Sequence, residues 1–252
     1  MSTAASGELA GKVAVVSGAS RGLGKAIAAL YAAEGARLVL IDLKLHWAEA
    51  AAEAIGHGAI GLGADVSDRA AITAALDTAA ARLGRIDVLV NNAMWNSYDM
   101  IPDITPEIFN RMVGVGLGGI VWGMQAAISH MPSGGSIINI GSMAGRLGSA
   151  GALLYAGVKA GVDGLTRSAS VELGPRGIRV NAIAPSTVAT EGVMAILAPA
   201  QLERRISQTP MGRLGTVDDI AQTALWLASE RSAFVTGQSL AVDGGIGHTL
   251  QR

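Results

Sequence analysis

Residues 12–24 read KVAVVSGASRGLG, a short apolar run followed directly by a glycine-rich turn. The apolar run is typical of a strand buried on both faces, and the alanine-rich stretch from about Gly22 to Glu34 is typical of a helix that Gly35 ends. Gly18 and Gly24 stand in the turn between the two patterns. The segment therefore predicts a strand, a tight turn and a helix, which is how a parallel α/β sheet begins.

The same alternation continues along the chain. Further strand patterns occupy residues 37–42, 59–64, 86–90, 136–140, 178–183 and 238–242. Helical patterns occupy residues 68–83, 105–131, 152–173 and 216–229, the last opened by a capping box of Thr216 and Asp219. Strands separated by helices pair in parallel through right-handed crossovers, so we predict an α/β fold with one doubly wound sheet of about seven strands flanked by helices.

Composition bounds the domain organisation and the partners. The chain has 252 residues, of which 50% are hydrophobic and 34 are glycine, which fits one large domain at residues 9–252 after a short mobile tail at residues 1–8. Lys and Arg total 19 against 20 for Asp and Glu, without a basic run, so we expect no nucleic-acid partner. The absence of cysteine excludes disulfides and is compatible with the cytoplasm, where we expect the protein. The four histidines have no metal-ligand spacing, so we expect no metal.

One stretch is borderline for a membrane span, because residues 112–128 carry no charge. The stretch contains five glycines, lacks flanking lysines and is followed by Pro132 and a strand pattern. We interpret it as a buried or interface helix and expect no membrane association.

The glycine turn is a candidate phosphate site. Gly18, Gly22 and Gly24 have the spacing G-x-x-x-G-x-G, and backbone N–H groups at the start of the following helix would hold a pyrophosphate. Asp42 ends the next strand, where a carboxylate would accept hydrogen bonds from the adenosine ribose and repel a 2′-phosphate, which favours NAD over NADP. Arg21 points the other way, since a cation in the turn could pair with that phosphate, and Asp42 could also be a solvated strand end.

A second candidate site involves the helix expected at residues 152–173. Tyr155 and Lys159 stand at i and i+4 on one helix face, and Ser142 follows the preceding strand at the sheet edge where such folds bind ligands. Because a nearby ammonium favours the phenolate, we expect Lys159 to lower the pKa of Tyr155. The pair alone could also be an ordinary surface contact.

Together these motifs resemble the short-chain dehydrogenase/reductase family. The likeness covers residues 11–247 and rests on the Gly18–Gly24 turn, Asp65-Val66, Asn91-Asn92-Ala93, the set Ser142, Tyr155 and Lys159, Arg179-Val180-Asn181-Ala182 with Pro185, and Val242-Asp243-Gly244-Gly245.

The resemblance implies a Rossmann-type domain with three catalytic residues. Ser142 would polarise the substrate oxygen, Tyr155 would exchange the proton and Lys159 would hold the nicotinamide ribose, while hydride passes between the substrate carbon and nicotinamide C4. The residues expected at the cofactor are Gly18, Ser20, Arg21, Gly22, Leu23, Gly24, Asp42, Leu43, Asp65, Val66, Asn91, Asn92, Ala93, Tyr155, Lys159, Pro185, Val188 and Thr190.

Three positions depart from the family pattern. Gly116, between Val115 and Leu117, replaces an asparagine that in the family kinks the long middle helix and holds a water beside the lysine. Met94 replaces a glycine, and Ser186 stands where glycine commonly follows the proline. Because glycine still permits a kink, we expect activity to survive with an altered proton path.

Residues beside the proposed site are candidates for contact with substrate. An apolar pocket, with ordinary packing as the alternative, is expected from Met94, Trp95, Met143, Leu147, Leu153 and Leu154. Residues 186–213 follow a strand end and would form a movable lid. Arg204 and Arg205 are expected on a solvated face of that lid, and Arg146 could meet an acidic substrate group.

These residues and the resemblance favour an NAD-dependent dehydrogenase that acts on a small, largely apolar secondary alcohol and is reversible as a ketone reductase. The resemblance also implies a homotetramer. One alternative is an NADPH-dependent 3-oxoacyl reductase, which Asp42 disfavours. The other is a nucleotide-binding regulator without catalysis, which the intact Ser142, Tyr155 and Lys159 disfavour.

Overall fold

The structure, a computed structural model, describes residues 7–249, which fold around one seven-stranded sheet with the strand order β3-β2-β1-β4-β5-β6-β7. All six neighbouring pairs are parallel, which confirms the predicted doubly wound sheet. The strands are β1 (Val13–Ser17), β2 (Arg37–Asp42), β3 (Ile60–Gly63), β4 (Val88–Asn91), β5 (Ser136–Ile140), β6 (Arg179–Pro185) and β7 (Ser239–Val242).

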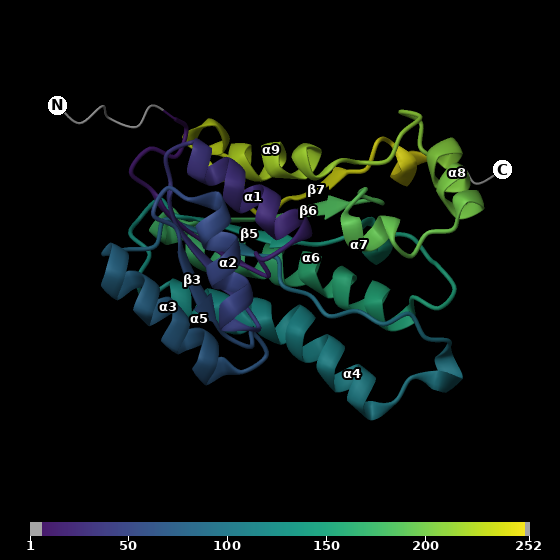
Figure 1. Cartoon of the computed structure of the whole chain (residues 1–252), viewed down its shortest axis with the longest axis horizontal. Coiled ribbons are helices and arrows are strands. Elements are labelled where there is room, and N and C mark those ends of the chain that lie inside the picture. Colours follow the sequence, from purple (N-terminus) through teal and green to yellow (C-terminus); the bar gives the residue numbers. More distant parts are fainter. Residues whose placement is uncertain (1–6, 250–252) are drawn as a thin grey trace.

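Helices cover both faces of the sheet (Figure 1). The α-helices are α1 (Gly22–Ala33), α2 (Leu45–Ile55), α3 (Arg69–Leu83), α4 (Pro106–Val113), α5 (Gly119–Ala127), α6 (Leu153–Leu173), α7 (Glu191–Met194), α8 (Pro199–Gln208) and α9 (Val217–Ala228).

Alternate strand residues supply two apolar cores. In β1, Val16 packs into the core under α1, α2 and α9, whereas Val15 packs into the core under α3 and α5. Tyr31 of α1 is fully buried and donates a hydrogen bond to the carbonyl of Ala224 in α9 at 2.8 Å. Successive side chains of a strand point to opposite faces of the sheet, so alternate apolar residues of these buried strands pack against different sets of helices.

The sequence patterns missed helix α2, and the reason is local. Lys44 precedes this helix and provides no side-chain cap, so the usual start signal is missing. α2 packs directly on β3, where a Cβ added at Gly61 would lie 2.4 Å from the backbone nitrogen of Glu49. The glycines that make β3 a weak strand pattern are thus the residues that let α2 approach it.

The long middle helix was predicted as one piece, and it runs without a break from α4 to α5, but its geometry changes in the middle. Between α4 and α5, residues Gly114–Gly118 form a π-helical segment. Such a segment is a recognised cause of a kink, so this helix departs from regular α-geometry at Gly116 without the family's asparagine. Gly123 of α5 also allows close packing within the chain, because a Cβ there would lie 2.6 Å from Asn91 Oδ1. Within the described residues, no helix is long and apolar enough to cross a membrane.

Two smaller expectations concern the tail and the histidines. Residues 1–6 of the predicted mobile tail lie outside the described residues, and Glu8, at its end, accepts a hydrogen bond from Arg231 at 2.7 Å. His130 is a surface group, and its Nε2 lies 2.7 Å from Oδ1 of Asp77 in α3. Residues 7–249 contain no cluster of three or more side chains suited to bind a metal.

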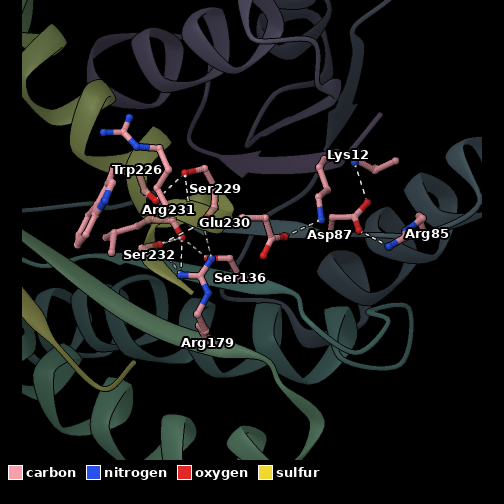
Figure 2. Close-up of polar contacts among 12 residues, drawn as sticks. Lys12, Arg85, Asp87, Ser136, Arg179, Trp226, Ser229, Glu230, Arg231 and Ser232 are labelled. Atoms are coloured by element: carbon pink, nitrogen blue, oxygen red, sulfur yellow. Dashed lines mark hydrogen bonds and ion pairs between the residues drawn. The ribbon is translucent and has the colours of Figure 1, made fainter. Parts of the chain in front are cut away.

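A polar network lies at the amino ends of the strands, at the opposite end of the sheet from the glycine turn (Figure 2). Buried Arg179, the first residue of β6, points toward the turn that follows α9, and it donates hydrogen bonds to the carbonyls of Leu227 at 2.7 Å and Ser229 at 3.1 Å and to the hydroxyl of Ser232 at 2.8 Å. Nearby, Asp87 accepts a hydrogen bond from the backbone N–H of Val13 at 2.9 Å and pairs with Arg85 (Figure 2). These contacts hold α9 and β1 at the amino ends of the strands.

Replacing Arg179 should destabilise the fold. Arg179→Met keeps most of the side-chain volume but leaves three buried acceptors without this donor, so we expect a loss of about 2–4 kcal/mol in the free energy of unfolding. Urea unfolding followed by circular dichroism measures it. Arg167→Met, at an exposed position of α6, is the matched control and should change stability little. Equal effects of the two substitutions would contradict the proposed importance of the network.

Candidate active site

The glycine turn lies at the carboxyl ends of β1 and β4, where the strand order reverses direction. In open α/β sheets this point forms the ligand-binding crevice. Gly18 has φ +62°, and a Cβ there would lie 2.8 Å from Ala93 Cα. A Cβ at Gly24 would lie 2.3 Å from the carbonyl oxygen of Gly18. These two positions therefore require glycine on steric grounds.

Asn92 holds this turn in place. Its side-chain amide donates hydrogen bonds to the carbonyls of Ser17 at 3.0 Å and Gly18 at 2.9 Å. In return, the Ser17 hydroxyl accepts hydrogen bonds from the backbone N–H groups of Asn92 at 3.1 Å and Ala93 at 3.2 Å. The Asn92 side chain was predicted at the cofactor, but its amide is committed to shaping the turn that would receive one.

Asp42 is tied to the same turn and is not simply a solvated strand end. Its carboxylate accepts hydrogen bonds from the backbone N–H groups of Ser20 at 3.0 Å and Leu43 at 2.8 Å. Beside it lies a cavity of about 380 Å³ with two cations in its lining, formed by Ser20, Arg21, Lys25, Trp47, Ala50 and Ala51. The end of the crevice where the sequence predicts the adenosine ribose therefore holds one carboxylate, which would repel a 2′-phosphate, and two cations, which could pair with one.

The remaining predicted cofactor residues are distributed along the carboxyl edge of the sheet. Asp65 accepts hydrogen bonds from Ser67, Val66 packs beneath α5, and Asn91 donates to Asn139 Oδ1 at 2.9 Å. Pro185 and Val188 are buried, whereas Thr190 caps α7 and its methyl group lies 3.8 Å from where a Cβ of Gly22 would be. Leu23 packs against the core.

The three candidate catalytic residues converge at the end of β5. Ser142 begins a short 3₁₀ turn after the strand, and its hydroxyl accepts a hydrogen bond from the backbone N–H of Ala144 at 3.1 Å. Tyr155 and Lys159 lie one turn apart on α6, with the ammonium 5.9 Å from the centre of the phenol ring. Lys159 is buried and donates a hydrogen bond to the carbonyl of Ile140 at 2.7 Å.

Burial controls the protonation of both groups. It raises the pKa of Tyr155 above its usual value of 10.0, although a polar contact with Ser142 opposes this shift. It lowers the pKa of Lys159 from 10.5 to about 8. We expected Lys159 to lower the pKa of Tyr155, but this pKa is raised, because desolvation of the phenol is the largest effect on it.

Comparisons with known proteins agree with this geometry. A family model described as enoyl-(acyl carrier protein) reductase matches residues 18–247. The trans-4-hydroxycyclohexanecarboxylate dehydrogenase of Sinomonas cyclohexanicum is 40% identical over 95% of this chain and 94% of the relative. The 3-oxoacyl-(acyl-carrier-protein) reductase of Escherichia coli K12 is 36% identical over 94% of this chain and 97% of the relative.

A solved structure agrees as well. A short-chain dehydrogenase/reductase from Brucella melitensis superposes with a TM-score of 0.91 at 30% identity, covering 96% of this chain and 98% of the other. The chain belongs to the short-chain dehydrogenase/reductase family. Members of this family are oxidoreductases that use nicotinamide cofactors.

The glycine turn fits such a cofactor. No side chain caps the start of α1 at Arg21, so the first N–H groups of this helix lack a side-chain acceptor. Orphan N–H groups at a helix N-terminus are suited to bind phosphate. The space above Gly22 is lined by the Thr190 methyl group and would be narrowed by any larger residue.

The side chains predicted for the substrate pocket of this short-chain dehydrogenase/reductase have mixed surroundings. Met143 is buried, and its methyl group lies 2.4 Å from where a Cβ of Gly247 would be, so it packs against the C-terminal segment. The Trp95 ring lies under the guanidinium of Arg111, at 4.5 Å. Of the other predicted residues, Leu147 is half-buried, Leu154 is half-buried and Leu153 is exposed. Several of these side chains are thus partly committed to packing.

Tyr98 is a neighbour of the site that the sequence patterns missed. Its ring centre lies 5.5 Å from that of Tyr155, with the planes at 51°. The position belongs to an irregular loop after β4, where periodicity gives no signal. The sequence offered one weak signal for a role of Tyr98 at the site: it is one of three tyrosines and stands only six positions after Asn92.

The predicted lid contains two helices that the sequence patterns did not reveal, α7 and α8. Val188 pairs with Gly215 as an isolated bridge, so both ends of this segment are tied together. Arg205 donates a hydrogen bond to the Thr187 hydroxyl at 2.6 Å. Arg146 lies 3.5 Å from Asp163 and donates to the Ser239 carbonyl, so it already has partners within the protein.

Replacing the buried Lys159 should stabilise the protein near neutral pH. The lowered pKa means that, between about pH 8 and pH 10.5, the unfolded chain binds a proton that the folded chain does not, so wild-type stability rises with pH there. Lys159→Met removes the cost of a buried charge, and we expect a gain of about 1–3 kcal/mol at pH 7 that shrinks toward pH 10.

Urea unfolding at pH 7, 9 and 10 measures this difference. Lys44→Met, at an exposed position before α2, is the matched control and should leave stability nearly constant. A Lys159→Met protein that is less stable than wild type at pH 7, with a gap independent of pH, would overturn this account of Lys159.

Proposed function

We propose that the protein is an NAD-dependent dehydrogenase of largely apolar secondary alcohols that also reduces the matching ketones. The observation that carries this proposal is the convergence of Ser142, Tyr155 and buried Lys159 at the carboxyl end of β5, on the same side of the sheet as a turn suited to bind phosphate. Tyr98 adds an aromatic surface against Tyr155.

The geometry supports a division of roles. The bound nicotinamide ring would supply or accept the hydride. Ser142 would orient the substrate oxygen, and Tyr155 would exchange a proton with it, because both hydroxyls face the same space after β5. The Lys159 ammonium, held by the Ile140 carbonyl, would favour the phenolate as substrate approaches. Burial disfavours either charge alone, so the ammonium and the phenolate would form together, because the attraction between them offsets the cost of desolvation.

An apolar substrate is favoured by the side chains that this end of the molecule exposes. Large apolar groups on the loop after β4, the start of α6 and the lid are 43–71% exposed, namely Tyr98, Leu153, Met194, Ile196 and Met211. Exposed apolar side chains gathered near a site are expected to meet a ligand. The relative from Sinomonas is named for a ring-bearing secondary alcohol that also carries a carboxylate, which supports the secondary alcohol but not its apolar character.

The second candidate is an NADPH-dependent 3-oxoacyl reductase. It is favoured by Arg21 and Lys25 in the cavity beside Asp42, which could pair with a 2′-phosphate, and by the relatives with that activity. Asp42 opposes it by charge repulsion. A nucleotide-binding regulator without catalysis would have no need for the costly burial of Lys159.

The proposal includes a cytoplasmic homotetramer with no nucleic-acid or membrane partner. Large apolar side chains on the outer surface, including Phe109, Val171 and Phe234, are exposed in the single chain and would suit subunit contacts. Light scattering coupled to size-exclusion chromatography measures the assembly directly.

Removing the phenol of Tyr155 should abolish turnover. Absorbance of NADH, followed with a panel of cyclic and linear secondary alcohols, should show a loss of kcat/KM of at least about 100-fold for Tyr155→Phe. Tyr31→Phe is the matched control, because that phenol bonds to Ala224 in the core far from the site, and it should retain turnover. Undiminished activity in Tyr155→Phe, or no activity in wild type with any alcohol or ketone, would refute the proposal.

Neutralising Asp42 should shift the cofactor preference. Asp42→Asn keeps a hydrogen-bond acceptor for the turn but removes the charge, so we expect kcat/KM with NADP to rise about 10-fold and that with NAD to fall. Arg21→Ala is the companion variant and should lower use of NADP alone. A wild-type protein that prefers NADP and loses this preference in Arg21→Ala would replace NAD with NADP in the proposal.

A further inference from the structure

Met94 lies over Gly116 and fills the space beside it. A Cβ added at Gly116 would lie 3.0 Å from Met94 Sδ, 3.2 Å from Met94 Cε and 2.5 Å from Val158 Cγ1. Gly116 is buried, whereas Met94 above it is half-buried. No side chain therefore fits at position 116 while Met94 and Val158 keep their places.

The two residues are reciprocal departures from the family pattern. One position exchanges a large side chain for glycine, and the other exchanges glycine for a large side chain. Their contact in the structure shows that the volume lost at Gly116 is taken by Met94. Volume-conserving exchanges are the kind that a packed interior tolerates best. The exchange also replaces a polar group with an apolar thioether.

This contact reaches the helix that carries the buried ammonium, one residue before it. Val158, which touches the Gly116 position, directly precedes Lys159 on α6. Lys159 donates a hydrogen bond to the Ile140 carbonyl, and burial is the cause that lowers its pKa. On the η3 side (Met143–Gly145), a Cβ at Gly145 would meet the Lys159 backbone, so this turn packs directly against α6 at Lys159.

The charged groups of the surrounding elements have other partners. Arg111 of α4 stacks on Trp95, and Asp163 of α6 binds Arg146 and Ser239 of β7. The titratable groups facing Lys159 are the Tyr155 phenol on its own helix and, behind it, the Tyr98 phenol of the loop after β4. Hydration, more than a charged neighbour, therefore governs the ammonium.

We propose that Met94 and Gly116 form one packing unit that keeps water away from Lys159, which makes Met94 a positioning residue for the ammonium. The unit replaces a hydrated polar side chain with a dry apolar one. Where it concerns turnover this inference rests on the proposed function, but its central claim concerns the state of Lys159 and holds with or without substrate.

Lysine NMR tests the proposal without turnover. The chain contains four lysines, so a protein labelled at lysine Cε gives few signals, and the Lys159 signal is the one absent from Lys159→Met. In wild type we expect its titration midpoint near pH 8. Met94→Ala opens space beside Gly116 for water, and the midpoint should rise by about one pH unit or more toward the ordinary value. Met94→Leu, of similar volume, should leave it near the wild-type value.

Matched variants distinguish the exclusion of water from Lys159 from a general loss of stability. Met100→Ala removes an exposed methionine from the same loop and should not move the Lys159 midpoint. Gly116→Ala should destabilise the wild-type background more than the Met94→Ala background, where only the contact with Val158 remains. A Lys159 midpoint that is unchanged in Met94→Ala, or moved equally by Met100→Ala, would overturn the proposal. If Tyr155→Phe retained turnover, the proposed function would fail while these titrations still judged the packing unit.

Discussion

The close contact between the glycine turn and Asn92 is the constraint on which the site depends. Gly18 and Gly24 approach the chain after β4 so closely that a single Cβ would collide with Ala93 or with the Asn92 amide. That amide bonds both Ser17 and Gly18, which joins the ends of β1 and β4 where the strand order reverses. Because the N–H groups of α1 begin in this turn, the clamp also fixes the direction in which a phosphate would be held.

A second set of buried polar contacts connects the strand β4, next to this turn, to β5 and then to α6. Asn91 in β4 donates to Asn139 in β5, and Asn139 donates to the Thr166 hydroxyl in α6 at 3.0 Å. Each of these groups is buried, so a shift in register would leave an unpaired amide in the core. Lys159 lies two helical turns before Thr166, and its own bond to Ile140 adds a further tie to β5. The distance between turn and catalytic helix is therefore set by hydrogen bonds as well as by packing.

Much of this arrangement could be predicted from the sequence, because apolar runs and glycine positions report local geometry. The strands, the capping box of α9 and the candidate residues Ser142, Tyr155 and Lys159 all followed from patterns of that kind. Helix α2 did not, since it lacks a capping side chain, and neither did Tyr98, whose place beside Tyr155 depends on an irregular loop. The opposite shift of the Tyr155 pKa was also out of reach, because sequence spacing says nothing about how much water a site excludes.

Water exclusion links the departures from the family pattern to the chemistry. Burial moves the pKa values of Tyr155 and Lys159 apart, that of the phenol upward from 10.0 and that of the ammonium downward from 10.5 to about 8, so each group alone is driven to its neutral form. Their charged forms are favourable mainly as a pair, because each then offsets the desolvation of the other. A dry surface made by Met94 over Gly116 strengthens that mutual dependence, since less water is present to stabilise either charge separately. The stability lost by burying the ammonium would thus make the proposed pair sensitive to a polar substrate group brought beside it.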